Sequence, residues 1–196
     1  YACFSPSSSG CPWRFEAFCK AGSKQWGKKL VASFDPLPQR ASYFEKKEDL
    51  LFDGNRALQR DVDHILLDNI DRLPEAFLAD ALEALSRAVN ADDDASKKAA
   101  YDELREAVED NAKVKRRLIN RLDDAIELAQ KRVEWNFKTA VPAFYPTKNT
   151  MSLLLPLDLT ENDQPDVALV VELMESGAYI GQTILTMKMA YNNARL

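Results

Sequence analysis

The spacing of apolar residues in the middle of the chain predicts helices. Across residues 56–67 apolar side chains recur every three or four positions, and Pro74 closes this first helical segment. A second apolar stripe of the same period covers residues 75–89. Residues 96–138 keep the rhythm and are expected to form one long helix or two stacked helices, with a weak point near Asn111.

After Pro142 the pattern changes to that of β-strands. Residues 151–159, 167–173 and 179–186 are rich in branched and aromatic side chains, and turn residues separate them. This arrangement predicts an antiparallel meander. The consecutive leucines 153–155 break the alternation of a half-exposed strand, which predicts a sheet covered on both faces, with helices on at least one of them.

The remaining segments complete the expected architecture. The first forty residues mix aromatic residues with prolines and predict short elements wrapped on a core, and short strands are expected at residues 41–44 and 50–52. We expect a single α+β domain over residues 1–196, with a helical region at 75–138 and an antiparallel sheet region at 139–196. The C-terminal sheet should have three to five strands packed against helices, with an inserted long helical arm.

The net charge of −5 disfavours indiscriminate coating of nucleic acid, because such coating depends on neutralising phosphates. The charges are unevenly spread, however. Residues 1–47 hold eight Lys or Arg against three Asp or Glu, whereas residues 158–175 hold six acids and no base. A localised basic surface is therefore compatible with the sequence.

The apolar stretches are far shorter than the roughly 20 residues that a bilayer requires, so no membrane partner is expected. The first residues lack the features of a signal peptide, and the chain does not begin with methionine. We interpret the chain as a fragment of a longer multidomain protein and expect a cytoplasmic location.

The cysteines agree with that location. Cys3, Cys11 and Cys19 are an odd number and all lie near the start of the chain, which argues against a disulfide framework. Their spacing matches no compact zinc pattern, so free thiols in a reducing compartment are the simpler interpretation. No metal and no cofactor are expected.

The single histidine, His64, is the first candidate for chemistry. Asp61 and Asp68 flank it at three and four residues along the predicted helix, and histidine with carboxylates can act as an acid or a base. No nucleophile is recognisable beside it. The structural alternative is a hydrogen-bonded corner formed by His64, Asp68 and Arg72.

Two groups of cations could contact nucleic acid. Basic residues crowd positions 113–121 just after several acids, which favours pairing along the helix surface over a nucleic-acid face. Aromatic and cationic residues also alternate around Trp135 and Lys138, at Tyr145, and near the C-terminus at Tyr191. Such residues can stack on unpaired bases and hold phosphates, although they serve equally well in a core.

Several segments resemble a known family. They are LDDAIELAQKRVEWNFKTAVPAFY, LLLPLDL, DVALVVEL, YIGQTILT and the terminal AYNNARL, with LPQRASYF and HILLDNIDRLP further upstream. In matching order these segments are similar to the family called domain of unknown function 3825. The chain departs from that pattern at residues 94–115, which look like the inserted helical arm.

The resemblance transfers no catalytic residue. It implies membership of larger bacterial and fungal proteins, sometimes beside modules suspected of handling RNA, which is the reason for expecting single-stranded RNA as a partner. Positions that match recurring polar residues would line one polar cleft if the helices, the sheet and the C-terminal segment converge. They are Arg40, His64, Asp68, Asn69, Arg72, Arg132, Asn136, Lys138, Tyr191, Asn192, Asn193 and Arg195.

The sequence therefore supports three hypotheses. The first is a non-catalytic RNA-binding module, and its ligand-binding candidates are Arg72, Arg132, Asn136, Lys138, Tyr145, Tyr191, Asn192, Asn193 and Arg195. The second is a hydrolase or nuclease that uses His64 and Asp68. The third is a scaffold that binds a protein partner through the helical arm.

Overall fold

The structure, a computed structural model, describes residues 1–8, 10–39, 46–79, 94–145 and 148–195. By its internal contacts the chain divides into two compact units, an N-terminal unit of residues 1–42 and a C-terminal unit of residues 43–196. Each is described separately, and the single domain over 1–196 stays a prediction. In the described residues, no helix combines the length and apolar character needed to cross a membrane.

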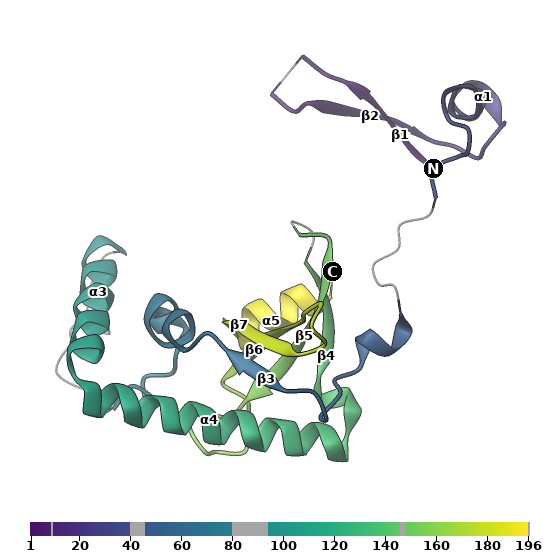
Figure 1. The fold of residues 1–196 in the computed structure, drawn as a ribbon. Helices are drawn as coiled ribbons and strands as arrows, with labels where there is room; N and C mark the ends of the chain where they lie inside the picture. Colours follow the sequence, from purple (N-terminus) through teal and green to yellow (C-terminus); the bar gives the residue numbers. More distant parts are fainter. Residues whose placement is uncertain (9, 40–45, 80–93, 146–147, 196) are drawn as a thin grey trace. The chain divides into compact units, whose positions relative to one another are not determined.

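The N-terminal unit is a β-hairpin followed by a helix (Figure 1). Strands β1 (Ala2–Pro6) and β2 (Trp13–Phe18) pair antiparallel, and helix α1 (Lys24–Ser33) comes after them. A glycine is required at position 27 because a Cβ atom there would lie 2.1 Å from the backbone oxygen of Lys20. This close approach holds the start of α1 against the segment that leads into it.

The C-terminal unit is built on one sheet. Its order is β3-β7-β6-β5-β4, with β3 at Leu58–Arg60, β4 at Val141–Tyr145, β5 at Thr150–Leu157, β6 at Val167–Leu173 and β7 at Tyr179–Thr186. Strands β4 to β7 form an antiparallel meander, because each pairs with the strand next to it in sequence. The edge strand β3 pairs with β7 in parallel.

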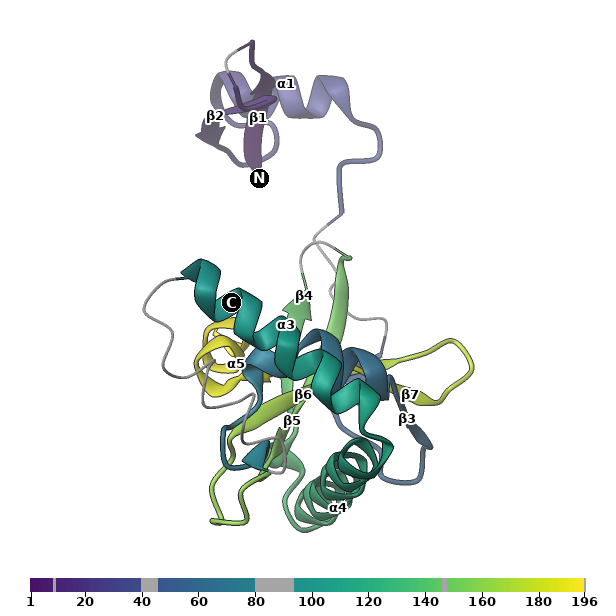
Figure 2. The ribbon, with the colours of Figure 1, turned by 90° about the vertical axis from the view of Figure 1, so that its left-hand side faces the viewer.

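Three α-helices of this unit are described (Figure 2). They are α3 (Asp94–Asp110), α4 (Ala112–Trp135) and the short α5 (Met187–Ala194). Shorter helical turns lie at Lys47–Leu50, His64–Asp68, Ile70–Arg72 and Phe137–Thr139. Asn111 separates α3 from α4 and caps the latter, since its side chain accepts hydrogen bonds from the N–H groups of Lys113 and Val114.

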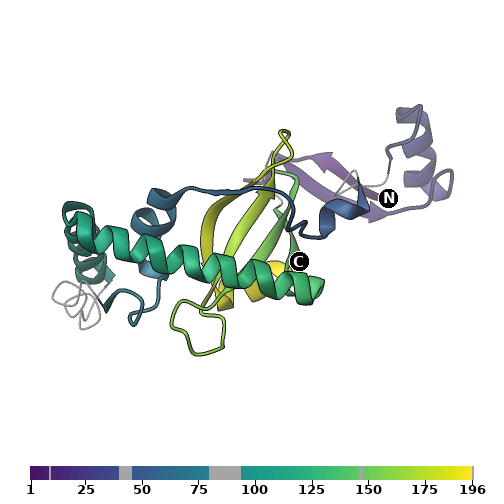
Figure 3. The ribbon, with the colours of Figure 1, turned by 60° about the horizontal axis from the view of Figure 1, so that its bottom comes forward.

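The two faces of the sheet are covered very unequally. Helix α4 crosses one face and α5 lies on the other (Figure 3). On the α4 side, Leu153 and Leu155 join the main core, which also takes in the buried face of α3. On the α5 side, Leu154 joins a far smaller apolar cluster around Ala190. We call the α5 side the open face.

Several expectations are confirmed. The fold is α+β with a C-terminal antiparallel meander and an inserted helical arm, and the long helical segment breaks at Asn111. The consecutive leucines 153–155 have the expected cause, because alternate residues enter cores on opposite faces.

Other expectations are wrong. Residues 58–60 are strand β3 and not part of a helix, because backbone pairing with the edge of β7 overrides the helical spacing there. Instead of a strand at 50–52, the chain makes a 3-10 helix at Lys47–Leu50. The expected sheet region also ends in helix α5. The strand expected at 41–44 and most of the helix expected at 75–89 fall outside the described residues.

The unequal faces lead to a stability prediction. Leu155 is fully buried on the α4 side, whereas Leu128 on α4 is 41% exposed. We expect Leu155→Ala to lower the free energy of unfolding by about 2–5 kcal/mol, because a cavity is left in the main core. Leu128→Ala should cost less than about 0.5 kcal/mol. Urea denaturation measures both, and equal losses would contradict the assignment of the core.

Candidate functional site

The open face carries a pocket of about 710 Å³. Its floor consists of residues from β4, β5, β6 and β7. Its walls are the helical turns around residues 61–72 on one side and α5 on the other. The pocket exists because α5 has only eight residues and covers just part of the face.

The first wall is built by backbone and side-chain hydrogen bonds. Asp61 continues the pairing of β3, since its N–H donates to Gly181 O, and its carboxylate accepts from the N–H of His64 at 3.1 Å. The amide of Asn69, which is only 4% exposed, donates to the carbonyl oxygen of His64 at 2.6 Å. These bonds fix the turn, so His64 borders the pocket with a defined backbone.

Arg72 stands at the same wall and is anchored on β7. Its Nη1 donates to Ile184 O at 2.8 Å and lies 3.4 Å from Thr183 Oγ1. All its hydrogen bonds to described residues use Nη1. Among the described residues, the other guanidinium N–H groups have no hydrogen-bond acceptor.

A polar network lies elsewhere along the pocket. Gln182 donates through Nε2 to Glu172 at 2.6 Å, and Lys148 donates to Gln182 Oε1 at 3.3 Å. The Lys148 ammonium also lies 5.9 Å from the centre of the Tyr145 ring, which is half-exposed. A flat aromatic surface thus stands beside a cation and an amide–carboxylate pair.

Ser152 is the unusual residue of the floor. It is 4% exposed and lines the pocket, yet its Oγ has no hydrogen-bond partner among the described residues. A buried hydroxyl without a partner costs free energy in the folded state. A ligand in the pocket could provide the missing bond.

The charges that line the pocket balance. Asp61 and Glu172 are acidic, and Arg72 and Lys148 are basic. A strongly anionic group such as a polyphosphate would meet both signs of charge here. A neutral, flat, polar molecule with at most one or two flanking anions fits the arrangement better.

Some of the residues predicted from sequence come together here. His64, Arg72, Tyr145 and Asn193 all border the pocket. Asp68 does not line it, but its carboxylate accepts a hydrogen bond from Nδ1 of His64 at 2.8 Å, as the sequence led us to consider.

Others lie elsewhere, at the end of α4. Arg132 lies 3.7 Å from Asp158 and 3.3 Å from Asp163, so its guanidinium is engaged by carboxylates. Asn136 accepts from the N–H of Lys138 and caps the turn that follows α4. The Lys138 ammonium lies 6.0 Å from the ring of Phe137. None of the predicted ligand residues of this segment lines the pocket.

Only some of the predicted ligand residues on the C-terminal helix α5 line the pocket. Asn193 borders the pocket together with Met189, one turn earlier. Tyr191 is 62% exposed and stacks with Arg195 at 5.2 Å, so this pair projects elsewhere from α5. Asn192 does not line the pocket either. Arg40 falls outside the described residues.

The basic segment of α4 has structural roles where its contacts are described. Lys115 pairs with Asp63 at 2.7 Å. Arg121 donates to the carbonyl oxygens of Phe77 and Leu159, and its guanidinium stacks on the Phe77 ring at 4.8 Å. The partners of these two residues lie in other segments and are not the acids at residues 106–110, so these contacts are not the pairing along the helix surface that the sequence suggested.

Sequence reasoning missed Lys148, Ser152, Glu172 and Gln182. One signal was present: Ser152 is a single hydroxyl in an apolar strand, at the same parity as Leu154, which faces away from the main core. Glu172 and Gln182 come together through the β6–β7 register, which includes an irregularity at Val170/Val171. That irregularity could not be read from the sequence.

The arrangement offers little for covalent chemistry. Ser152 Oγ accepts no bond from, and donates none to, His64, so this imidazole does not activate the Ser152 hydroxyl. In the same residues, no group of three or more His, Cys, Asp or Glu is placed to hold a metal ion. Binding is the chemistry that these side chains support directly.

Comparison with known proteins adds the family and nothing further. No curated protein and no solved structure matches the chain. The family model described as Domain of unknown function (DUF3825) matches residues 1–196, so the chain belongs to this family.

Proposed function

We propose that the C-terminal unit is a non-catalytic binding module for single-stranded RNA, and that the pocket on the open face seats one unpaired nucleotide. The observation that carries the proposal is the buried Ser152 hydroxyl, which lacks a partner among the described residues and lines an open pocket beside Tyr145 and Lys148. RNA is favoured over other ligands by the association that the family resemblance implies.

The aromatic rim suits a base. Unpaired bases bind proteins by stacking on aromatic side chains, and the contact tolerates any base because each has a π-face. Tyr145 is half-exposed at the rim, and Lys148 beside it can neutralise a neighbouring phosphate. Arg72 supplies further donors from the opposite wall.

The floor suits the polar edge of a base. Glu172 offers acceptors, Gln182 offers both a donor and an acceptor, and Ser152 offers a hydroxyl that can do either. Such groups form hydrogen bonds with the Watson–Crick edge of a splayed-out base. The balanced charge of the lining agrees with a neutral base in the pocket and phosphates at its rim.

This proposal predicts salt-sensitive binding that depends on the pocket. The full chain should bind a labelled single-stranded oligoribonucleotide at low salt, and the affinity should fall as salt rises. Tyr145→Ala and Lys148→Ala should each weaken binding about three- to tenfold, because stacking or a phosphate contact is lost. Fluorescence anisotropy measures the affinities.

Lys138→Ala is the matched control for the lysine, because Lys138 is exposed but does not line the pocket. Its effect should be smaller than that of Lys148→Ala. The assignment of the pocket would be contradicted by no RNA binding at low salt, or by an equal loss of RNA affinity in both lysine variants.

Ser152 provides a test in which stability and binding move apart. Ser152→Ala removes a buried polar atom that lacks a partner, so the free energy of unfolding should stay the same or rise by about 1 kcal/mol. RNA affinity should nevertheless fall several-fold. Thr160→Val is the contrast, because the Thr160 hydroxyl lies 3.0 Å from Asp166 and its loss should destabilise the fold. A destabilised Ser152→Ala protein with unchanged affinity would contradict the proposed role.

One observation favours a second candidate, a hydrolase or nuclease. His64 borders the pocket and is hydrogen-bonded to Asp68, an arrangement that can orient an imidazole for acid–base catalysis. If the protein cleaves RNA, His64→Ala should abolish cleavage of a labelled oligoribonucleotide and leave thermal stability unchanged. If the module only binds RNA, the wild-type chain leaves that oligoribonucleotide intact. Cleavage by the wild-type chain would therefore contradict the binding proposal and favour the hydrolase or nuclease.

The third candidate, a scaffold built on the helical arm, has less to support it. The apolar residues of α3, among them Leu104 and Val108, are fully buried in the main core. Arg105 also donates to Leu67 O at 2.9 Å. The arm therefore uses its large apolar side chains within its own unit, and the surface that α3 leaves for a partner consists of polar residues and a few alanines.

A further inference from the structure

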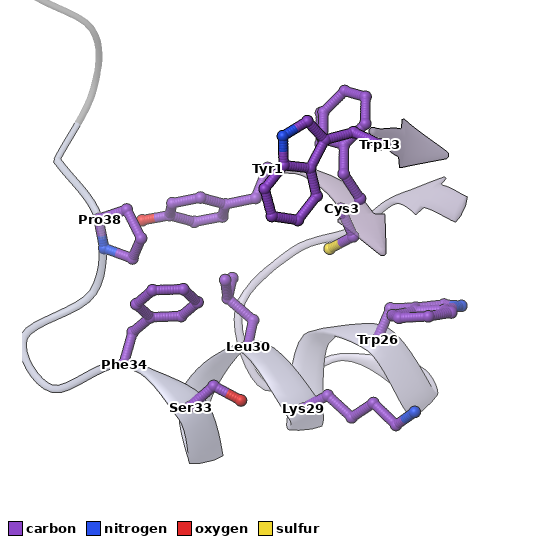
Figure 4. Close-up of a pocket in the computed structure, with 11 residues that line it drawn as sticks. Tyr1, Cys3, Trp13, Trp26, Lys29, Leu30, Ser33, Phe34 and Pro38 are labelled. Atoms are coloured by element: carbon purple, nitrogen blue, oxygen red, sulfur yellow. The ribbon is translucent and has the colours of Figure 1, made fainter. Parts of the chain in front are cut away.

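The N-terminal unit has a pocket of its own, between the hairpin and α1 (Figure 4). Its volume is about 640 Å³. The hairpin contributes Tyr1, Phe4 and Trp13, and α1 with its following residues contributes Trp26 and Phe34. Five aromatic residues therefore line one small pocket, and the figure shows the rings of Tyr1 and Phe34 facing the space above Leu30.

These rings are more exposed than aromatic residues of a core. Trp13 is 61% exposed, Phe4 is 56% exposed and Phe34 is 49% exposed. Two further exposed rings extend the surface along the hairpin, because Phe15 lies 5.6 Å from Phe4 and 5.0 Å from Phe18. A contiguous exposed aromatic surface of this kind marks a binding site more often than a structural feature.

The surroundings of the pocket are cationic. Residues 1–42 contain six Lys or Arg against two acids. Lys29 lines the pocket and lies 4.8 Å from the Trp26 ring. Within the described part of the chain, neither Lys29 nor its exposed neighbours Lys20, Lys24 and Lys28 have a carboxylate within ion-pair distance, whereas Arg14 is paired with Glu16 at 2.7 Å.

The lysines, the aromatic rings and the thiol of this pocket restrict the class of ligand that it can bind. An aromatic cage for a cationic ligand is disfavoured, because the nearby ammonium groups would repel it. Thiol chemistry is disfavoured as well. The hydrogen bond between the Cys3 and Cys19 sulfur atoms raises the pKa of the Cys3 thiol above its ordinary value, which disfavours the reactive thiolate. A flat ligand that carries negative charge meets both the rings and the lysines.

We infer that this aromatic pocket is a second binding site for single-stranded RNA, in which Trp13 and Trp26 contact bases while Lys29 and the neighbouring lysines neutralise phosphates. Stacking platforms bordered by cations are the general solution for holding single strands. The choice of RNA over DNA rests on the proposed function. The site itself does not, because its residues belong to the N-terminal unit alone.

Tryptophan fluorescence gives a readout confined to this unit. The chain has three tryptophans, Trp13, Trp26 and Trp135, so in the Trp135→Phe variant all tryptophan emission comes from the aromatic pocket. Adding a single-stranded oligoribonucleotide to this full-length variant should quench the emission saturably, and more weakly at high salt. Lys29→Glu should weaken the binding roughly tenfold or more, because an exposed cation near phosphates is reversed.

The controls separate this site from the pocket on the open face. Tyr145→Ala added to the Trp135→Phe chain should leave the quenching unchanged if the two sites act independently. Quenching without any effect of Tyr145→Ala or Lys148→Ala on overall affinity would support this site and remove the other. A fall in overall affinity in Tyr145→Ala or Lys148→Ala, without any quenching of tryptophan emission by RNA, would support the pocket on the open face and remove this site. Lys131→Glu, at an exposed lysine of α4, is the matched charge reversal and should leave quenching intact.

Four results would overturn the inference. They are the absence of quenching at low salt, equal quenching by single-stranded and double-stranded RNA, tighter binding of single-stranded DNA than of RNA, and self-association of the free chain that already shields Trp13 and Trp26 from acrylamide. The last result would make a second copy of the chain the occupant of this surface.

Discussion

A β-sheet has two faces, and an apolar face must be covered by other parts of the protein or by a ligand. In the C-terminal unit the 24 residues of α4, with α3 beside them, bury one face in a large core, whereas the eight residues of α5 cover only part of the other. The remaining floor carries Ser152, Glu172 and Gln182 among apolar neighbours. This inequality creates the pocket, and it explains why polar side chains are tolerated in the middle of otherwise apolar strands.

Much of this architecture could be predicted from the sequence, and the exceptions have physical causes. The strands at 167–173 and 179–186 were predicted with the bounds that the structure shows, because branched residues dominate them. Strand β3 was missed because three residues carry too little pattern to compete with a helical spacing, and its pairing with β7 is a long-range contact. The short helix α5 was missed because one turn of apolar residues resembles the end of a strand.

The site was predicted less completely, and arginine is the main reason. Arg132 was predicted to bind phosphate, but its guanidinium pairs with the carboxylates of Asp158 and Asp163. Other arginines donate to main-chain carbonyl oxygens: Arg56 to Gly177, Arg72 to Ile184, Arg105 to Leu67, and Arg121 to Phe77 and Leu159. Such bonds satisfy buried backbone groups, and no local sequence pattern separates them from ligand contacts. The residues that do converge, such as Tyr145 and Asn193, required the fold to bring together segments almost fifty residues apart.

The central claim is that the open face of the sheet binds an unpaired nucleotide. It is tested most directly by recording amide chemical shifts of the isotope-labelled full chain while a single-stranded oligoribonucleotide is added. We predict saturable shifts at Ser152, Glu172 and Gln182, together with their neighbours on β5 to β7. Shifts confined to other surfaces, with these three amides unmoved at saturation, would contradict it.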